Sequence, residues 1–252
     1  MKISVCGKGG SGKSTIVTLL AKAAKERGFL VLVIDSDESN SSLFRMLGFK
    51  SPPLPLMELL GGKGALKKKM QKPNVFEGEE IRLEEIPSRY IRNNDGFMLL
   101  SIGKILRSLE GCACPMGVLS REFLKKLRLN ENWIALVDME AGVEHFGRGI
   151  DEAIDKVILV VEPSFESVNI AEKIRELAGG MKKDVIAILN KMPSEEVTQK
   201  LEREIKGRGI EIIGTMPNDP EVFDACLEGH VLDKGEAFHA AEKVLERLLS
   251  ER

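Results

Sequence analysis

A glycine-rich segment with two lysines, residues 7–14, carries the clearest chemistry in the sequence. It reads Gly-Lys-Gly-Gly-Ser-Gly-Lys-Ser and fits the pattern G-x-x-x-x-G-K-[ST] between an apolar run and a helical pattern. Glycines let backbone N–H groups converge around phosphate oxygens, and the N-terminus of the following helix adds a positive dipole end. Lys13 is expected to neutralise β/γ-phosphate charge, and the Ser14 hydroxyl to ligate Mg²⁺. The expected nucleotide contacts in this loop are Gly9, Gly10, Ser11, Gly12, Lys13, Ser14 and Thr15.

Three aspartates lie at or just after the ends of apolar runs, where a Mg-nucleotide hydrolase needs carboxylates. Asp138 ends the run 134–137, which is the position of a Walker B aspartate that holds metal-bound water. Asp35 and Asp37 follow the run 30–34. One such acid alone is more typical of a strand end or a helix N-cap, but three at these places favour a catalytic metal site. Gly142 is expected to offer a backbone N–H that a triphosphate orders and that hydrolysis releases.

A polar pair, Asn190 and Lys191, follows the apolar run 185–189, where P-loop proteins bind the base. GTP-binding proteins place an aspartate two residues after this lysine to accept hydrogen bonds from guanine. Pro193 stands at that position in this chain. The sequence therefore favours adenine, and ATP or ADP as the ligand. An ordinary helix start is the alternative interpretation of the Asn-Lys pair.

Two cysteines, Cys112 and Cys114, lie two residues apart in a loop flanked by glycine and proline, residues 111–117. Thiolates suit Zn²⁺ and other borderline or soft ions, but a closed tetrahedral thiolate site needs four of them. The other two cysteines, Cys6 in a predicted strand and Cys226 in a predicted helix, are poorly placed to help. A two-fold dimer to which each chain contributes the pair would complete a Ni²⁺ or Zn²⁺ site. A redox pair and two incidental small residues are the alternatives.

Residues 8–14 also match the pattern K-G-G-x-G-K-[ST] completely, because a second lysine, Lys8, precedes the glycines. The chain thus resembles the deviant Walker A ATPases, which include MinD, ParA, the arsenite pump ATPase and nitrogenase iron protein. This resemblance implies that Lys8 reaches across a nucleotide sandwich dimer to the partner's phosphates, rather than being a solvated loop lysine. It also implies that Asp37 positions the attacking water, that Asp35 lies near the metal, and that the base is contacted by Asn190 and by a turn containing Pro217 and Asp219.

The segment 138–149, Asp-Met-Glu-Ala-Gly-Val-Glu-His-Phe-Gly-Arg-Gly, and the cysteine pair narrow the resemblance to the CooC family over essentially the whole chain. The resemblance implies an ATP-hydrolysing homodimeric metallochaperone that inserts nickel into a client metalloenzyme, carbon monoxide dehydrogenase. His145 is interpreted as a surface-turn residue in preference to a further ligand or a switch residue. Two other functions stay open: a MinD- or ParA-like positioning ATPase, and a nitrogenase-like reductase with a cluster between subunits.

Seven apolar runs predict the strands that must position these groups: 3–6, 30–34, 97–102, 134–137, 157–161, 185–189 and 210–213. Most are continuous rather than alternating, which is typical of parallel strands buried on both faces. Helical patterns lie between several of them, for example 167–177 and 195–205, and a last helix is predicted over 236–249. We predict a single α/β domain over residues 1–252, a doubly wound and mostly parallel P-loop NTPase fold.

The segment 50–96 departs from this pattern. It begins rich in proline and glycine, continues with five lysines and no acid in 63–72, and then has five glutamates and one arginine in 77–85. Such charge segregation is typical of a solvated, mobile surface segment. A partner-docking or nucleotide-responsive surface is the alternative.

The composition excludes several partners. A net charge of −2 provides no global basic field for nucleic acid, and an aromatic content of 5% is low for base stacking. No apolar run reaches the roughly 18–20 residues of a membrane span, and the chain enters its first strand without a signal peptide. The polar face of the C-terminal helix carries equal numbers of acids and bases, which favours packing on the domain. We therefore expect a cytoplasmic protein with no nucleic-acid partner and no stable membrane association.

Overall fold

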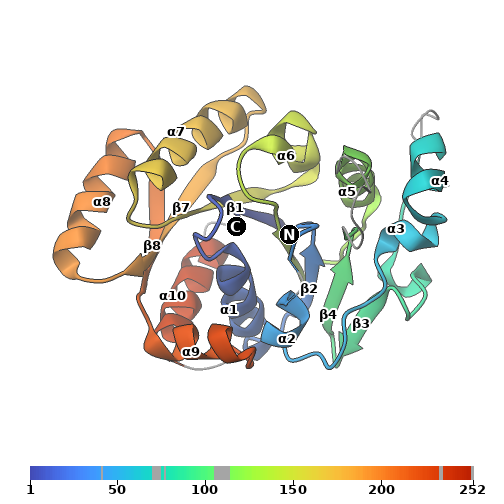
Figure 1. Cartoon of the computed structure of the whole chain (residues 1–252), viewed down its shortest axis with the longest axis horizontal. Helices are drawn as coiled ribbons and strands as arrows, with labels where there is room; N and C mark the ends of the chain where they lie inside the picture. Colours follow the sequence, from blue (N-terminus) through green and yellow to red (C-terminus); the bar gives the residue numbers. More distant parts are fainter. Residues whose placement is uncertain (41, 70–74, 77, 105–113, 233–234, 251–252) are drawn as a thin grey trace.

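An eight-stranded sheet runs through the centre of the computed structural model, which describes residues 1–40, 42–69, 75–76, 78–104, 114–232 and 235–250 (Figure 1). The strand order is β3-β4-β2-β5-β1-β6-β7-β8, and every neighbouring pair is parallel except β3 and β4. The predicted doubly wound α/β fold is thereby confirmed. The strands are β1 (Lys2–Gly7), β2 (Leu30–Asp35), β3 (Ile91–Asn94), β4 (Phe97–Ser101), β5 (Trp133–Asp138), β6 (Lys156–Val161), β7 (Val185–Met192) and β8 (Glu211–Pro217).

Helices cover both faces of this sheet. The α-helices are α1 (Lys13–Glu26), α2 (Leu43–Met46), α3 (Leu56–Leu59), α4 (Gly62–Lys69), α5 (Cys114–Lys126), α6 (Glu144–Gly147), α7 (Phe165–Gly180), α8 (Glu195–Gly207), α9 (Pro220–Glu228) and α10 (Glu236–Ser250). Two short 3₁₀ helices are η1 (Leu83–Glu85) and η2 (Ile150–Ala153). One apolar cluster joins α1 and α10 to one face, and the other joins α5, α7 and α8 to the opposite face. Both faces are buried, which explains the continuous apolar runs.

The C-terminal helix α10 packs on the domain, as its charge pattern predicts. Its apolar stripe is buried against α1 and β8, and consists of Ala237, Phe238, Ala241, Val244, Leu245 and Leu248. Across the described ranges, the structure contains no helix whose length and apolarity would suffice to cross a bilayer.

Strand β3 is absent from the sequence prediction, which has only seven strands. It forms an antiparallel hairpin with β4, and Asn94 pairs with Phe97 across a two-residue turn. The turn residues Asp95 and Gly96 both have positive φ, 51° and 75°. An Asp-Gly pair at such a turn is a recognised hairpin signal, so the strand was predictable from residues 95–96.

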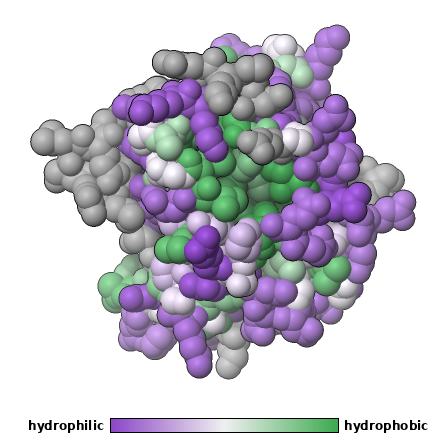
Figure 2. All heavy atoms as spheres, turned by 90° about the vertical axis from the view of Figure 1, so that its right-hand side faces the viewer, coloured by the Kyte–Doolittle hydropathy of each residue, from purple (hydrophilic) through white to green (hydrophobic). Residues whose placement is uncertain are grey.

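The segment 50–96 is not solvated throughout its described part. Its apolar side chains, including Leu56, Leu66 and Tyr90, are buried in the same cluster as α5. Lysines 67 and 68 and glutamates 79, 80, 84 and 85 remain exposed. Figure 2 shows the face of the molecule that lies on the right in Figure 1, with apolar side chains in a central hollow and hydrophilic ones around it. The prediction of a solvated surface therefore fits the charged residues and is wrong for the apolar ones, because the hydrophobic effect draws the latter onto the sheet.

Candidate nucleotide site

The loop between β1 and α1 is held in place by a residue at the end of β7, Asn190. The Nδ2 of Asn190 donates a hydrogen bond to the carbonyl oxygen of Ser11 over 2.8 Å. Gly12 has φ 96°, and a Cβ at this position would overlap the Asn190 amide. Only glycine therefore satisfies both the left-handed backbone and the close approach. Asn190 thus holds the shape of the phosphate loop.

A cleft of about 570 Å³ opens above this loop, at the carboxyl ends of the parallel strands. Its walls include most of the residues that the sequence assigns to nucleotide: Gly9, Gly10, Gly12, Lys13, Ser14, Thr15, Asp37, Asn190, Lys191, Pro217 and Asp219. A cleft of about 630 Å³ lies at the other end of the strands, beside Asp155, Lys156 and Lys183. We place the nucleotide in the first cleft, because open α/β sheets bind ligands at the carboxyl ends of their strands. Ser11 is fully buried beneath the loop rather than lining the cleft.

Ser14 and Asp138 meet directly at the start of α1. The Ser14 hydroxyl donates to Asp138 Oδ2 over 2.6 Å, and the Nδ2 of Asn40 donates to the Ser14 hydroxyl over 2.9 Å. Within the described part of the chain, the buried atoms Asp138 Oδ1 and Asp35 Oδ1 have no hydrogen-bond partner. The Asp138 carboxylate and the Ser14 hydroxyl are oxygen donors suited to Mg²⁺, and Asp35 stands opposite Asp138 on the neighbouring strand. When bound, this ion would neutralise phosphate charge.

Burial raises the pKa of both aspartates. The pKa of Asp138 rises to about 6, against the opposing hydrogen bond from Ser14. The pKa of Asp35 rises to about 7, against the opposing charge of Lys104, whose Nζ lies 2.6 Å from Asp35 Oδ2. Both carboxyl groups are therefore desolvated, and a bound cation would favour their ionised form.

Asp138→Asn should stabilise the nucleotide-free chain at neutral pH. The pKa of Asp138 rises on folding, from 3.8 to about 6. Its contribution to stability is therefore fully present below pH 3.8, and is lost as the pH rises to about 6. The neutral asparagine avoids this loss, so urea unfolding should show the variant more stable by on the order of 1–3 kcal/mol at about pH 8. A variant less stable than the wild type at that pH would contradict a desolvated carboxylate.

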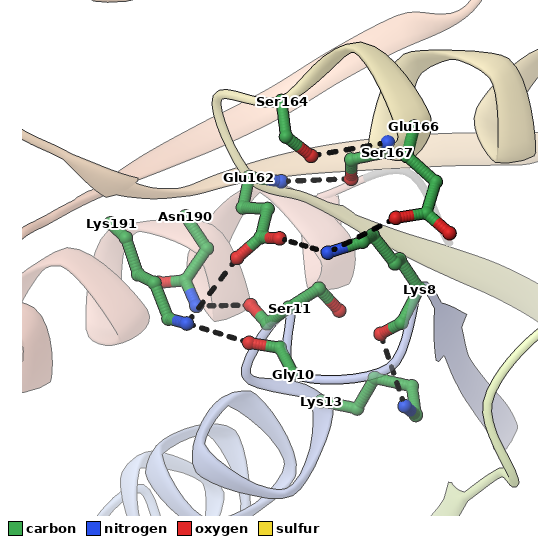
Figure 3. Close-up of polar contacts among 10 residues, drawn as sticks. All are labelled: Lys8, Gly10, Ser11, Lys13, Glu162, Ser164, Glu166, Ser167, Asn190 and Lys191. Carbon is green, nitrogen blue, oxygen red and sulfur yellow. Dashed lines mark hydrogen bonds and ion pairs between the residues drawn. The ribbon is translucent and has the colours of Figure 1, made fainter.

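The two lysines of the loop occupy different environments (Figure 3). Lys13 is 7% exposed, and its Nζ lies 3.4 Å from the Lys8 carbonyl oxygen. Lys8 extends away from the loop to the start of α7, where its Nζ lies 2.8 Å from Glu162 Oε1 and 3.5 Å from Glu166 Oε2. The hydrogen bond to Glu162 raises the pKa of Lys8.

Glu162 binds two lysines at once. Its second carboxylate oxygen lies 3.3 Å from the Nζ of Lys191, which also donates to the Gly10 carbonyl over 2.6 Å. Burial acts to raise the pKa of Glu162, but the hydrogen bonds from Lys8 and Lys191 outweigh it and hold this pKa below its ordinary value. Glu162 thus ties the phosphate loop to the Asn-Lys pair.

On the expected base side, Asp219 shapes the wall of the cleft through its backbone contacts. One carboxylate oxygen caps α9 by accepting from the N–H of Glu221, and the other accepts from the N–H of Ala237, both over 2.9 Å. Pro217, Val222 and Phe223 line the same wall. Asp219 therefore fixes the start of α9 beside the cleft.

His145 is fully buried, so its interpretation as a surface-turn residue is wrong. Its Nδ1 lies 2.7 Å from Asp151 Oδ2, and the Ser4 hydroxyl donates to Asp151 Oδ1 over 2.9 Å. Helix α6 turns both His145 and Phe146 inward, and the buried carboxylate of Asp151 partners Nδ1 of the ring, whereas the buried Nε2 has no hydrogen-bond partner among the described residues. The histidine links β1 to the chain that follows Asp138.

The predicted metal loop falls largely outside the described residues. Cys112 lies outside them, and Cys114 enters the description only as the first residue of α5. Among the residues that the structure describes, His, Cys, Asp and Glu side chains form no group of three or more suited to a metal ion. Cys6 is buried and Cys226 is exposed at the nucleotide cleft.

Three residues at the site were missed from the sequence: Asn40, Lys104 and Glu162. Glu162 directly follows the predicted strand 157–161, and Lys104 comes two residues after 97–102. Polar residues at the carboxyl ends of parallel strands were therefore a usable signal. Asn40 had no such signal, because its contact with Ser14 depends on the turn of the chain after Asp37.

The fold and the phosphate loop define an ATP-binding P-loop protein. Residues 3–232 match the model of the CobQ/CobB/MinD/ParA nucleotide binding domain, and the chain belongs to this family.

Among its relatives, an uncharacterized ATP-binding protein of Methanocaldococcus jannaschii is 44% identical over 239 residues, covering 92% of this chain and 94% of that protein. The carbon monoxide dehydrogenase accessory protein CooC of Rhodospirillum rubrum is 33% identical over 235 residues, covering 91% and 88%. The MinD protein of Pyrococcus horikoshii, solved with Mg-ADP, superposes with a TM-score of 0.73 at 20% identity, covering 98% and 95%. The last similarity concerns the fold alone.

Proposed function

We propose that the protein is a Mg²⁺-dependent ATP hydrolase that acts as a homodimer and delivers nickel to an apo-metalloenzyme such as carbon monoxide dehydrogenase. The observation that carries the hydrolase is the cluster of Ser14, Asp138 and Asn40 at the mouth of the phosphate loop. It combines a hydroxyl and a buried carboxylate for a metal with a cleft whose loop offers backbone N–H groups to phosphates.

Different residues of the chain would perform different parts of the reaction. The loop and Lys13 would bind and orient the phosphates, and Asp37, on the wall of the same cleft, would position the attacking water. In the structure the Asp37 carboxylate accepts from the backbone N–H and the hydroxyl of Ser39, over 2.9 and 2.6 Å. The Gly142 N–H donates to the Gly7 carbonyl over 3.2 Å, so it must leave this bond to reach a phosphate.

The nickel-delivery part of the proposal rests on the cysteine pair and on the similarity to CooC, whose name describes an accessory protein of carbon monoxide dehydrogenase. Cys112 and Cys114 supply two thiolates per chain, and two-fold symmetry would supply the other two. Bound metal would then favour the dimer, because only the dimer offers the complete site. ATP would act on the same association equilibrium at the phosphate end, so the two ligands should be coupled.

Cys112→Ala or Cys114→Ala should abolish the binding of Ni²⁺ or Zn²⁺, at an expected stoichiometry of one ion per dimer, and leave ATP binding intact. Metal analysis of anaerobically purified protein, with and without ATP, measures this directly. Cys226→Ala is the matched control, because it removes a described, exposed thiol outside the pair and should keep the metal. One tight ion per monomer, unaffected by either substitution, would contradict a shared site and leave the ATPase proposal standing.

The alternative functions give different results in simple assays. A positioning ATPase should sediment with anionic vesicles or DNA in the presence of ATP. The burial of the apolar stripe of α10 speaks against a membrane-binding role for that helix. A reductase with an inter-subunit iron–sulfur cluster should be brown when purified without oxygen, whereas a thiolate site for nickel or zinc should not.

A further inference from the structure

Lys104 lies just beyond β4, at a position for which no sequence motif predicts a function. Strand β4 runs parallel to β2, and Ser101 stands opposite Asp35. The chain that leaves β4 therefore passes beside the residues that follow β2. The Lys104 side chain is directed into this junction and is only 15% exposed.

The ammonium group of Lys104 is fully engaged by residues 35–40. Its Nζ lies 2.6 Å from Asp35 Oδ2 and 2.5 Å from the Asp37 carbonyl oxygen, and it also donates to the Asn40 carbonyl oxygen. These three acceptors match the three N–H donors of a lysine. The two carbonyls bracket a turn in which the N–H of Asn40 donates to the Asp37 carbonyl over 3.3 Å. Lys104 therefore pins both ends of this turn.

The pinned turn carries two side chains of the candidate site. Asp37 lines the nucleotide cleft, and Asn40 donates to the Ser14 hydroxyl over 2.9 Å and to Asp138 Oδ2 over 3.3 Å. Helix α5 supports the same stretch, because the hydroxyls of Ser36 and Ser120 lie 3.0 Å apart. Lys104 does not itself line the cleft, yet it bonds the backbone of Asp37 and Asn40, which do.

We propose that Lys104 is a positioning residue for ATP hydrolysis, whose ammonium holds the turn 37–40 against Ser14 and Asp138 so that Asp37 is placed for the attacking water. The inference rests on the proposed ATPase function. A turn released from the lysine would leave the phosphate loop intact, because the loop is held separately by Asn190. The lysine should therefore affect turnover much more than nucleotide binding.

Lys104→Met is the test, with Lys126→Met as the matched control. Lys126 is also a half-buried lysine, and it donates to two carbonyl oxygens, of Phe76 and Gly78, over 2.8 and 2.7 Å, outside the nucleotide cleft. In Lys104→Met, kcat should fall by about 10–100-fold while the Kd for ATP changes less than about threefold, since small misplacements of a reacting group have such effects. Lys126→Met should keep kcat within about threefold of the wild type. An equal loss of kcat in both variants, or a loss in affinity as large as the loss in kcat, would overturn the positioning role.

Hydrogen exchange provides a readout that does not depend on turnover. Without nucleotide, the amides of residues 36–40 should exchange faster in Lys104→Met than in the wild type or in Lys126→Met. Lys104→Gln keeps a donor but removes the charge, so the exchange rate of these amides should lie between the rates in the wild type and in Lys104→Met. Unchanged exchange at these amides would overturn the inference even if the wild type hydrolyses ATP. If the wild type hydrolyses no ATP, the proposed function is overturned. Faster exchange in Lys104→Met would in that case still show that the lysine anchors the turn.

Discussion

Lys13→Ala should lose essentially all ATP turnover, with kcat/KM reduced by on the order of 10³-fold or more, as expected when a main electrostatic stabiliser is removed from a phosphoryl-transfer site. Lys13 is the first residue of α1, is 7% exposed, and lines the cleft at the phosphate loop. The positive charge of Lys13 lies where negative charge on the β- and γ-phosphates would develop during transfer. Alanine leaves the backbone N–H groups of the loop in place, so weak nucleotide binding should remain.

Lys25→Ala is the control for this substitution. Lys25 lies on the same helix, near its C-terminal end, and contacts Asp95 rather than the cleft. It should keep turnover within about twofold, as surface substitutions usually do. A coupled assay with ATP and GTP measures both variants and the base preference together. Turnover retained in Lys13→Ala, or a strong preference for GTP in the wild type, would contradict the assignment of the loop and of Pro193.

The arrangement of the sheet was predictable because burial on both faces leaves a simple trace in the sequence. Most of the predicted strands are continuous apolar runs, and each predicted run corresponds to a strand of the structure, as 157–161 does to β6. The fold then places the phosphate loop, Asp37 and Asn190 around one cleft, since parallel strands bring their carboxyl ends to the same edge. Local pattern and topology together were therefore sufficient for this part of the site.

The parts that were missed depend on contacts between distant segments. The buried His145 lies against the carboxylate of Asp151, which in turn accepts a hydrogen bond from Ser4, and no local pattern marks a histidine that will be buried in this way. Lys104 reaches Asp35 only because β4 is the neighbour of β2, and this strand order does not follow from the sequence of either strand. The many charged residues of 50–96 led to the prediction of a solvated segment. The hydrophobic effect nevertheless buries its apolar residues, regardless of their exposed neighbours.

Lys8→Ala should bind ATP normally and lose both ATP-induced dimerisation and hydrolysis. Lys8 is not among the residues that line the cleft of its own chain, and its side chain extends away from the loop toward Glu162 and Glu166. The loop and Lys13 therefore remain to hold the phosphates when Lys8 is removed. A partner's triphosphate would offer this lysine more negative charge than the two glutamates do, so the cation should exchange one set of partners for the other on dimerisation. The loss would resemble the removal of an arginine finger from a GTPase site.

Glu162→Gln distinguishes the effect of losing Lys8 from the effect of losing its ion pair with Glu162. This variant disrupts the same contact within the chain but keeps Lys8, and Gln still accepts a hydrogen bond from Lys191. If Lys8 acts across the dimer, Glu162→Gln should still dimerise with ATP in sedimentation velocity, whereas Lys8→Ala should stay monomeric at the same concentrations. Turnover should follow the dimer, so Glu162→Gln retains it and Lys8→Ala falls by on the order of 10³-fold. Normal ATP-induced dimerisation of Lys8→Ala would show that the lysine serves only its own chain, and equal loss in both variants would assign the effect to the ion pair instead.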